Sequence, residues 1–161
     1  MNLDDVLLYG HRTVLMAFDG LSEAECNVNG VCGHWSVREI IAHLTSHELV
    51  SNDVMKLFLD AGASTPHFTR YVAQGGLAFN DLEVEARSGM SWWEVVREYT
   101  AAATEAKELA ARVPVEVRRQ VGTIPWYGAE YDLEDLFAYS NYGHKREHCA
   151  QIAVYRDTLG H

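Results

Sequence analysis

The chain has few of the features that mark secreted, membrane-embedded or nucleic-acid-binding proteins. Its three cysteines form no CxxC pair among 161 residues, which indicates a reducing, cytoplasmic compartment rather than a disulfide framework. No apolar run approaches the ~18 residues of a membrane span, and the acidic residues 1–5 lack the basic region of a signal peptide. The net charge is −10, without a cluster of Lys or Arg, so phosphate backbones are repelled. We therefore expect neither nucleic acid nor membrane as a partner.

What is present is the composition of an ordinary globular protein. Hydrophobic residues make up 48% of the chain and charged residues 22%. The length suits one sizeable core, and we find no repeats, low-complexity runs or linkers. We expect a single domain over residues 1–161.

Apolar residues at helical spacing predict four long helices. Two of them begin at capping boxes of the form S-x-x-E, at Ser36 and at Ser91, and Pro114 ends the latter helix. The expected ranges are roughly 3–19, 36–58, 91–113 and 132–159. The long connection at about 62–90 has a later part, 77–87, that is expected to add helical turns to the third helix, and 121–128 is expected to be extended or a turn. The predicted fold is all-α: a four-helix bundle with a long crossover between helices 2 and 3.

Eight histidines are numerous for this length, but only their positions are informative. Half of them fall at expected surface, loop or terminal positions: His11, His34, His67 and His161. The other half lie on stripes that should face the core: His43, His47, His144 and His148. A lone histidine on such a stripe is usually a hydrogen-bonded core residue. A group of them favours a shared metal, because a buried ring nitrogen without a partner costs about 1–3 kcal/mol.

The spacing of the last pair suits metal binding. His144 and His148 are one helical turn apart on the same face, so both can reach a single ion at roughly 2.0–2.1 Å. A third ligand must come from another helix, where either His43 or His47 is available. Three neutral imidazoles leave a coordination position open, which is typical of reactive rather than structural sites.

The stretch from His144 to His148 also matches the peptidase pattern H-x-x-E-H, with Glu147 as the general base. Peptidases with this inverted motif are much larger and take an acidic third ligand well downstream. Here the only acid after His148 is Asp157, so we do not expect a protease. Glu147 is then a neighbour of the site or a solvated charge.

Residues 35–44, WSVREIIAHL, followed by His144-x-x-x-His148, resemble the DinB/YfiT-like superfamily. This group includes the metal-binding domain of mycothiol-dependent maleylpyruvate isomerase and the ClbS/DfsB-like proteins. The resemblance implies a metal held by His43, His144 and His148. Periodicity instead places His47 nearer the centre of the helical face, so His47 is expected as a neighbour or a fourth ligand.

The stretch from Asn80 to Arg87 resembles a segment that precedes the third helix in relatives. That resemblance implies that Asn80 faces the pocket; the alternative is an N-cap and a surface arginine. Cys149 lies about 100° around the helix from His148, so we expect it to be packed rather than catalytic.

The resemblance implies a divalent ion, Zn or Ni first, at which a low-molecular-weight thiol or a water is activated against a small electrophile. The expected activity is that of a thiol S-transferase, an isomerase or a hydrolase, with metal-bound water or thiolate as the reacting group. The expected pocket walls are Trp126, Tyr127 and Tyr142. The alternative is a non-enzymatic protein that binds and sequesters a small molecule in a metal-stabilised bundle. Because adjacent Trp92 and Trp93 must leave one indole outward, a homodimer is also expected.

Overall fold

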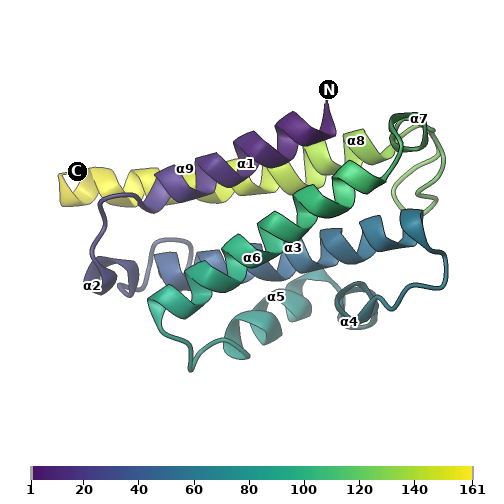
Figure 1. Ribbon diagram of the computed structural model, residues 1–161. Coiled ribbons are helices and arrows are strands. Elements are labelled where there is room, and N and C mark those ends of the chain that lie inside the picture. Colours follow the sequence, from purple (N-terminus) through teal and green to yellow (C-terminus); the bar gives the residue numbers. More distant parts are fainter. Residues whose placement is uncertain (1, 161) are drawn as a thin grey trace.

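A computed structural model describes residues 2–160, and every regular element in that range is a helix (Figure 1). The long helices are α1 (Leu3–Phe18), α3 (Val37–Leu59), α6 (Trp92–Arg112) and α9 (His144–Leu159). Shorter ones are α2 (Glu23–Cys26), α4 (Pro66–Gln74), α5 (Gly76–Glu85), α7 (Val115–Arg118), α8 (Leu133–Leu136) and the π-helix η1 (Phe137–Gly143).

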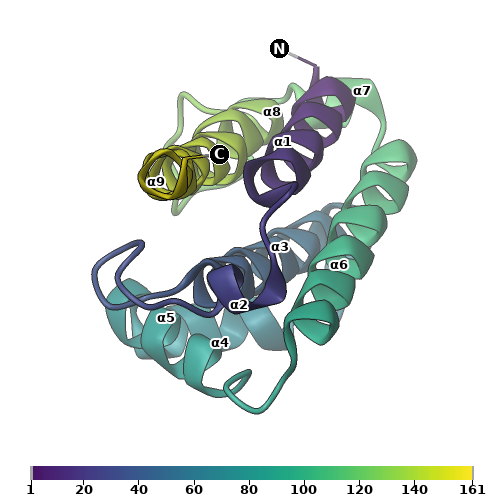
Figure 2. The same ribbon diagram turned by 90° about the vertical axis from the view of Figure 1, so that its left-hand side faces the viewer.

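The long helices pack in pairs. Helix α1 lies beside α9, and α3 packs extensively against α6 (Figures 1 and 2). Helices α4 and α5 lie on α3, on the side away from α1 and α9 (Figure 2). This arrangement gives α3 neighbours on most sides, and it brings segments about a hundred residues apart in the sequence to a common interior.

The predicted helix starts are confirmed at atomic detail. The Ser36 hydroxyl accepts from the backbone N–H of Glu39, whose carboxylate accepts from the Ser36 N–H at 2.8 Å. Ser91 and Glu94 make the same reciprocal pair ahead of α6. Each box satisfies two backbone groups that a helix end otherwise leaves free. Helix α6 ends at Arg112, just before Pro114, as predicted.

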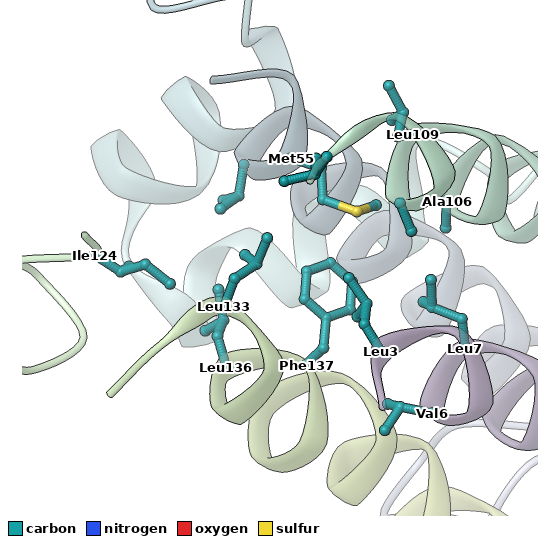
Figure 3. Packing of buried hydrophobic residues seen from close by; sticks show 13 residues of the cluster. Leu3, Val6, Leu7, Met55, Ala106, Leu109, Ile124, Leu133, Leu136 and Phe137 are labelled. Atoms are coloured by element: carbon teal, nitrogen blue, oxygen red, sulfur yellow. The ribbon is translucent and has the colours of Figure 1, made fainter. Parts of the chain in front are cut away.

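The core consists of two clusters of buried apolar side chains. The first fills the space between α1, α3, α6 and the α8–η1 segment, and Figure 3 shows it from close by. Its labelled members are Leu3, Val6, Leu7, Met55, Ala106, Leu109, Ile124, Leu133, Leu136 and Phe137. The second cluster lies toward the starts of α3 and α6 and includes Ile40, Ile41, Leu44, Trp92, Tyr99 and Ile152. The predicted apolar stripes of α3 and α6 therefore face inward.

The connection between α3 and α6 is more regular than expected. It contains α4 and α5, and α5 is a separate helix rather than an extension of α6. Gly75, at φ +74°, separates α4 from α5 in a conformation that favours glycine. Helix α4 has no capping side chain of its own, and Asp53 of α3 instead accepts from the backbone N–H groups of His67 and Phe68 at 2.7 and 3.2 Å.

The expected helix over 132–159 is interrupted by η1, whose π-helical turn is wider than an α-helical one. The wider turn changes which side chains face the interior. Asn141 and Lys145 are buried. Ser140 is exposed, although a constant helical period over 132–159 predicts it on the core-facing stripe with Leu136 and His144. The predicted stripe is therefore wrong at these positions, because it assumed 100° per residue throughout.

One consequence of this rotation is a buried ion pair between α9 and α3. The Nζ of Lys145 lies 2.6 Å from Oε2 of Glu48, with both side chains almost inaccessible to solvent. Asn141 also donates to Oε2 of Glu48, at 3.1 Å. On α1, a Cβ at Gly10 would lie 3.3 Å from the Lys145 side chain, so a glycine there leaves room for it. Periodicity did not predict this pair.

Removing one partner of this ion pair should cost far more than replacing both. We expect Lys145→Met to destabilise the metal-free protein by about 3–5 kcal/mol, because it leaves the Glu48 carboxylate buried without a counter-charge. The double variant Glu48→Gln/Lys145→Met should recover most of that loss, since the new amide is neutral and still offers Asn141 an acceptor. Urea unfolding followed by circular dichroism measures both.

Arg146→Met is the matched control, because Arg146 is the exposed neighbour of Lys145. Its effect should stay within about 0.5 kcal/mol. Equal losses from Lys145→Met and Arg146→Met would contradict the role assigned to the ion pair.

Candidate metal centre

Four histidines from two helices gather at the centre of the molecule. His43 and His47 come from α3, and His144 and His148 from α9. The His43 ring centroid lies 4.6–4.9 Å from those of the other three. Among the described residues, His43, His144 and His148 form a group in which one ring nitrogen of each lies within 4.8 Å of the others. This cluster, here called the triad, is compatible with a metal site.

Hydrogen bonding alone does not satisfy the triad. Nε2 of His144 lies 2.9 Å from Nε2 of His43 and 3.0 Å from Nε2 of His148. A neutral ring nitrogen carries either one proton or one lone pair, so it makes one good hydrogen bond and not two. On His148, Nδ1 lies 2.8 Å from the side-chain oxygen of Gln151, which fixes the proton on Nδ1 and leaves Nε2 with a lone pair. A cation accepts lone pairs from all three Nε2 atoms together, and so the donor set fits a metal ion.

Burial keeps these imidazoles neutral. Desolvation, reinforced by the neighbouring histidines, lowers the pKa of His43 to about 2 and that of His144 to about 3. Desolvation also lowers the pKa of His148, against an opposing effect of its hydrogen bond to Gln151. Metal ligation requires the neutral form, so the site is prepared for a cation near neutral pH.

His47 stands beside the triad with its own partner. Its Nε2 lies 2.9 Å from Oδ1 of Asn80, an acceptor, so the ring donates from that nitrogen. Asn80 lies within α5 and is not an N-cap, and its side chain contacts His47. The geometry therefore groups His43 with the α9 histidines and places His47 as their neighbour.

Two other candidates lie away from the triad. Arg87 is buried, where it pairs with Glu83 at 3.0 Å and with Glu98 at 2.7 Å and so ties α5 to α6. It is neither a surface residue nor part of the pocket. Glu147 is exposed, so its position gives no support to the protease hypothesis.

The cysteines are not activated. Cys149 is buried as predicted, and desolvation raises the pKa of its thiol to about 11. Burial likewise raises the pKa of Cys26 to about 12 and that of Cys32 above its ordinary value. These residues remain protonated thiols at neutral pH, and a protein-borne thiolate nucleophile is not favoured.

The other described histidines lie apart from the triad. His34 is exposed, and His67 contacts Arg70 on α4. His11 was expected at the surface but is half-buried on α1, where its ring lies 5.5 Å from that of Tyr99. His161 lies outside the described residues.

A cavity of about 320 Å³ adjoins the histidine cluster. It is lined by His47, Val50, Ser51, Val54, Tyr71, Trp126, Tyr127, Leu136, Phe137, Ser140 and Asn141. Trp126 and Tyr127 line it as expected, but Tyr142 lies instead beside Asp5, Val6 and Tyr9. Of the residues that were not predicted, Ser51 lies on the histidine-bearing stripe of α3, whereas Asn141 is brought here by the π-helical turn and carries no signal in the sequence.

Comparison with known proteins agrees with this arrangement. The model of the DinB superfamily matches residues 7–152, which is most of the chain. The chain belongs to the DinB superfamily. Searches of curated protein sequences and of solved structures return no significant match. None of the helices between residues 2 and 160 combines the length and apolarity that crossing a membrane requires.

If the triad binds a divalent ion, each of its members should be needed. We expect His43→Ala, His144→Ala and His148→Ala each to weaken metal binding by more than about a hundredfold, since loss of a mere supporting partner already costs 10–100-fold. His47→Ala, in the same cluster, is the control and should retain the ion. Equilibrium dialysis against Zn or Ni with elemental analysis measures this. Loss of metal in His47→Ala but not in His43→Ala would reverse the assignment.

The ion should stabilise the protein without being needed for its fold. Two apolar clusters lie outside the triad, so helical circular dichroism should survive chelation at room temperature. Metal at a hundred times its dissociation constant should add about 2.7 kcal/mol and raise Tm. Complete unfolding on chelation would make the ion structural, whereas a Tm indifferent to both chelator and metal would return the histidines to a packing role.

Proposed function

We propose that the protein is a metal-dependent enzyme that acts on a small electrophile with water or a low-molecular-weight thiol as the nucleophile. The observation that carries this proposal is the triad of neutral imidazoles beside a cavity of about 320 Å³. His43, His144 and His148 would hold the ion, Zn or Ni first. Such an ion, when bound, supplies Lewis acidity and lowers the pKa of a bound water or thiol.

The residues around the triad orient His148 and His47 and limit the access of water. Gln151 orients His148 by accepting from its Nδ1, and Asn80 orients His47 through its Nε2. The walls from α3, η1 and residues 126–127 exclude water from one side of a bound molecule. Since all three cysteine thiols are held protonated, the nucleophile comes from outside the chain.

A second candidate function is sequestration of a small molecule without turnover. It is favoured by the cavity wall, in which His47 is the one imidazole among the described lining residues, and burial lowers the pKa of that ring. A carboxylate or lysine, the usual groups for proton transfer, does not appear among the lining residues. In this case the metal stabilises the protein and takes no part in chemistry.

The proposal also covers the bundle topology, the cellular compartment and the oligomeric state of the protein. We propose that the long helices form a four-helix bundle with α4 and α5 in its crossover, and that the protein works in the cytoplasm, where its free cysteines persist. We also propose a homodimer, supported by the Trp93 indole, which is 60% exposed beside the buried Trp92.

Turnover distinguishes the two functions. Metal-loaded protein is incubated with a panel of epoxides, activated alkenes and strained rings, with and without each of mycothiol, bacillithiol and glutathione, and the products are identified by mass spectrometry. Catalytic thiol adducts indicate transfer, and hydrated product without thiol indicates hydrolysis. We expect His144→Ala to lose the activity by about a hundredfold or more.

His34→Ala is the matched control for this experiment, because His34 is exposed and outside the triad. Stoichiometric protection from the electrophile without product would favour sequestration. Equal turnover by His144→Ala and the unaltered protein would contradict the proposed metal chemistry.

A further inference from the structure

The described wall of the cavity beside the triad contains no carboxylate, lysine or arginine side chain. Its aromatic members are Tyr71, Trp126, Tyr127 and Phe137, its aliphatic members Val50, Val54 and Leu136, and its polar members His47, Ser51, Ser140 and Asn141. Moving an ionised group from water into such a wall is costly unless a counter-charge pairs with it.

The charged side chains Glu48 and Lys145, close to the cavity, are already paired with each other. Glu48, on the turn of α3 between His47 and Ser51, is paired with Lys145 at 2.6 Å and accepts from Asn141. The side-chain amide of Asn141 is therefore already hydrogen-bonded to the Glu48 carboxylate. A cationic ligand would be repelled by an ion in the triad, and an anionic one by the net charge of −10 except at the ion itself. Both signs of charge are therefore disfavoured within the wall.

The volume of the cavity and the shape of its wall further limit which ligands fit. The cavity of about 320 Å³ is the volume of about ten water molecules in the liquid, which limits an enclosed ligand to about ten non-hydrogen atoms. Flat aromatic faces favour a planar ring through stacking and edge contacts. The polar members are contributed by α3 and the η1 segment and include His47, whereas Trp126 and Tyr127 come from the loop after α7.

We propose that the substrate is an uncharged, ring-containing molecule of about ten non-hydrogen atoms, with a polar substituent directed toward His47 and its ring against Trp126. This inference rests on the proposed function in taking the cavity as the substrate's site. It also separates the two reactants: a peptide thiol such as glutathione carries carboxylates that this wall does not pair, so the cavity holds the electrophile alone.

Trp126 is the residue that sets the size limit. It also lines a second cavity of about 230 Å³, together with Val54, Phe58, Val117 and Ile124, so the indole is a shared wall of the two spaces. Its ring packs against Phe68 at 5.3 Å between centroids, and the side chain is 53% exposed. Shortening it opens one cavity to the other with little loss of core packing.

The test uses three probes that share a phenyl ring and differ in charge: benzamide, benzoate and benzylamine. Binding to the metal-free full-length protein is measured by ligand-observed NMR, which removes direct ligation of benzoate by the ion. We expect benzamide to bind at least about tenfold more tightly than either charged probe. Trp126→Ala should weaken benzamide binding about tenfold and favour the bicyclic amide 2-naphthamide. Trp93→Ala, at another indole that is more than half exposed, should change the binding of neither amide by more than about twofold.

Benzoate or benzylamine binding as tightly as benzamide would overturn the inference, as would absence of benzamide binding or equal effects of the two tryptophan variants. These outcomes are independent of turnover. Selective benzamide binding by a protein that turns over nothing in the electrophile panel leaves this inference standing and removes the proposed enzymatic function. Turnover of charged electrophiles without benzamide binding would overturn this inference and leave the proposed enzymatic function standing.

Discussion

Helix α3 is buried along most of its length. The hydroxyls of Thr45 and Ser46 donate to carbonyls of their own helix, but its longer buried polar side chains take partners from other helices. The partners differ along the helix: His43 faces His144, Glu48 pairs with Lys145, Asn52 donates to the Ala102 carbonyl of α6, and Asp53 caps α4. Leaving any of these groups without a partner would cost about 1–3 kcal/mol, and more for the charged ones. The contacts therefore specify which helices surround α3 as well as stabilising them.

The geometry of the histidine triad is a special case of this constraint. His43 is as buried as the apolar residues around it, but its Nε2 faces the Nε2 of His144, which the Nε2 of His148 also approaches. One nitrogen of His144 cannot make a good hydrogen bond to both. The ion pair between Glu48 and Lys145 joins the same two helices as the triad. Glu48 lies just over one turn after His43 on α3, and Lys145 lies between the two α9 histidines of the triad. Because the pair is buried, it fixes the separation between α3 and α9. A metal site with ligands from both helices requires such a fixed separation.

The cavity follows from the same packing. The wider turn of η1 moves Ser140 to the rim and Asn141 into the wall, directly before the α9 histidines. Such π-helical turns are frequent at functional sites, because they place side chains that a regular helix would direct elsewhere. Residues 137–148 thus contribute to the histidine triad, to the cavity and to the buried pair, opposite one stretch of α3.

Local rules determined the helices and the chemistry of the candidate ligands. The capping boxes at Ser36 and Ser91, the stop before Pro114 and the i, i+4 spacing of His144 and His148 depend on neighbours within a turn or two, so the sequence alone carried them. Tertiary structure decided the rest. It grouped His43 rather than His47 with the α9 pair, since Asn80 of α5 engages His47. It also brought Lys145 to Glu48 and moved Tyr142 away from the cavity, because a single π-helical segment rotates every later residue in a way that a fixed 100° period does not describe.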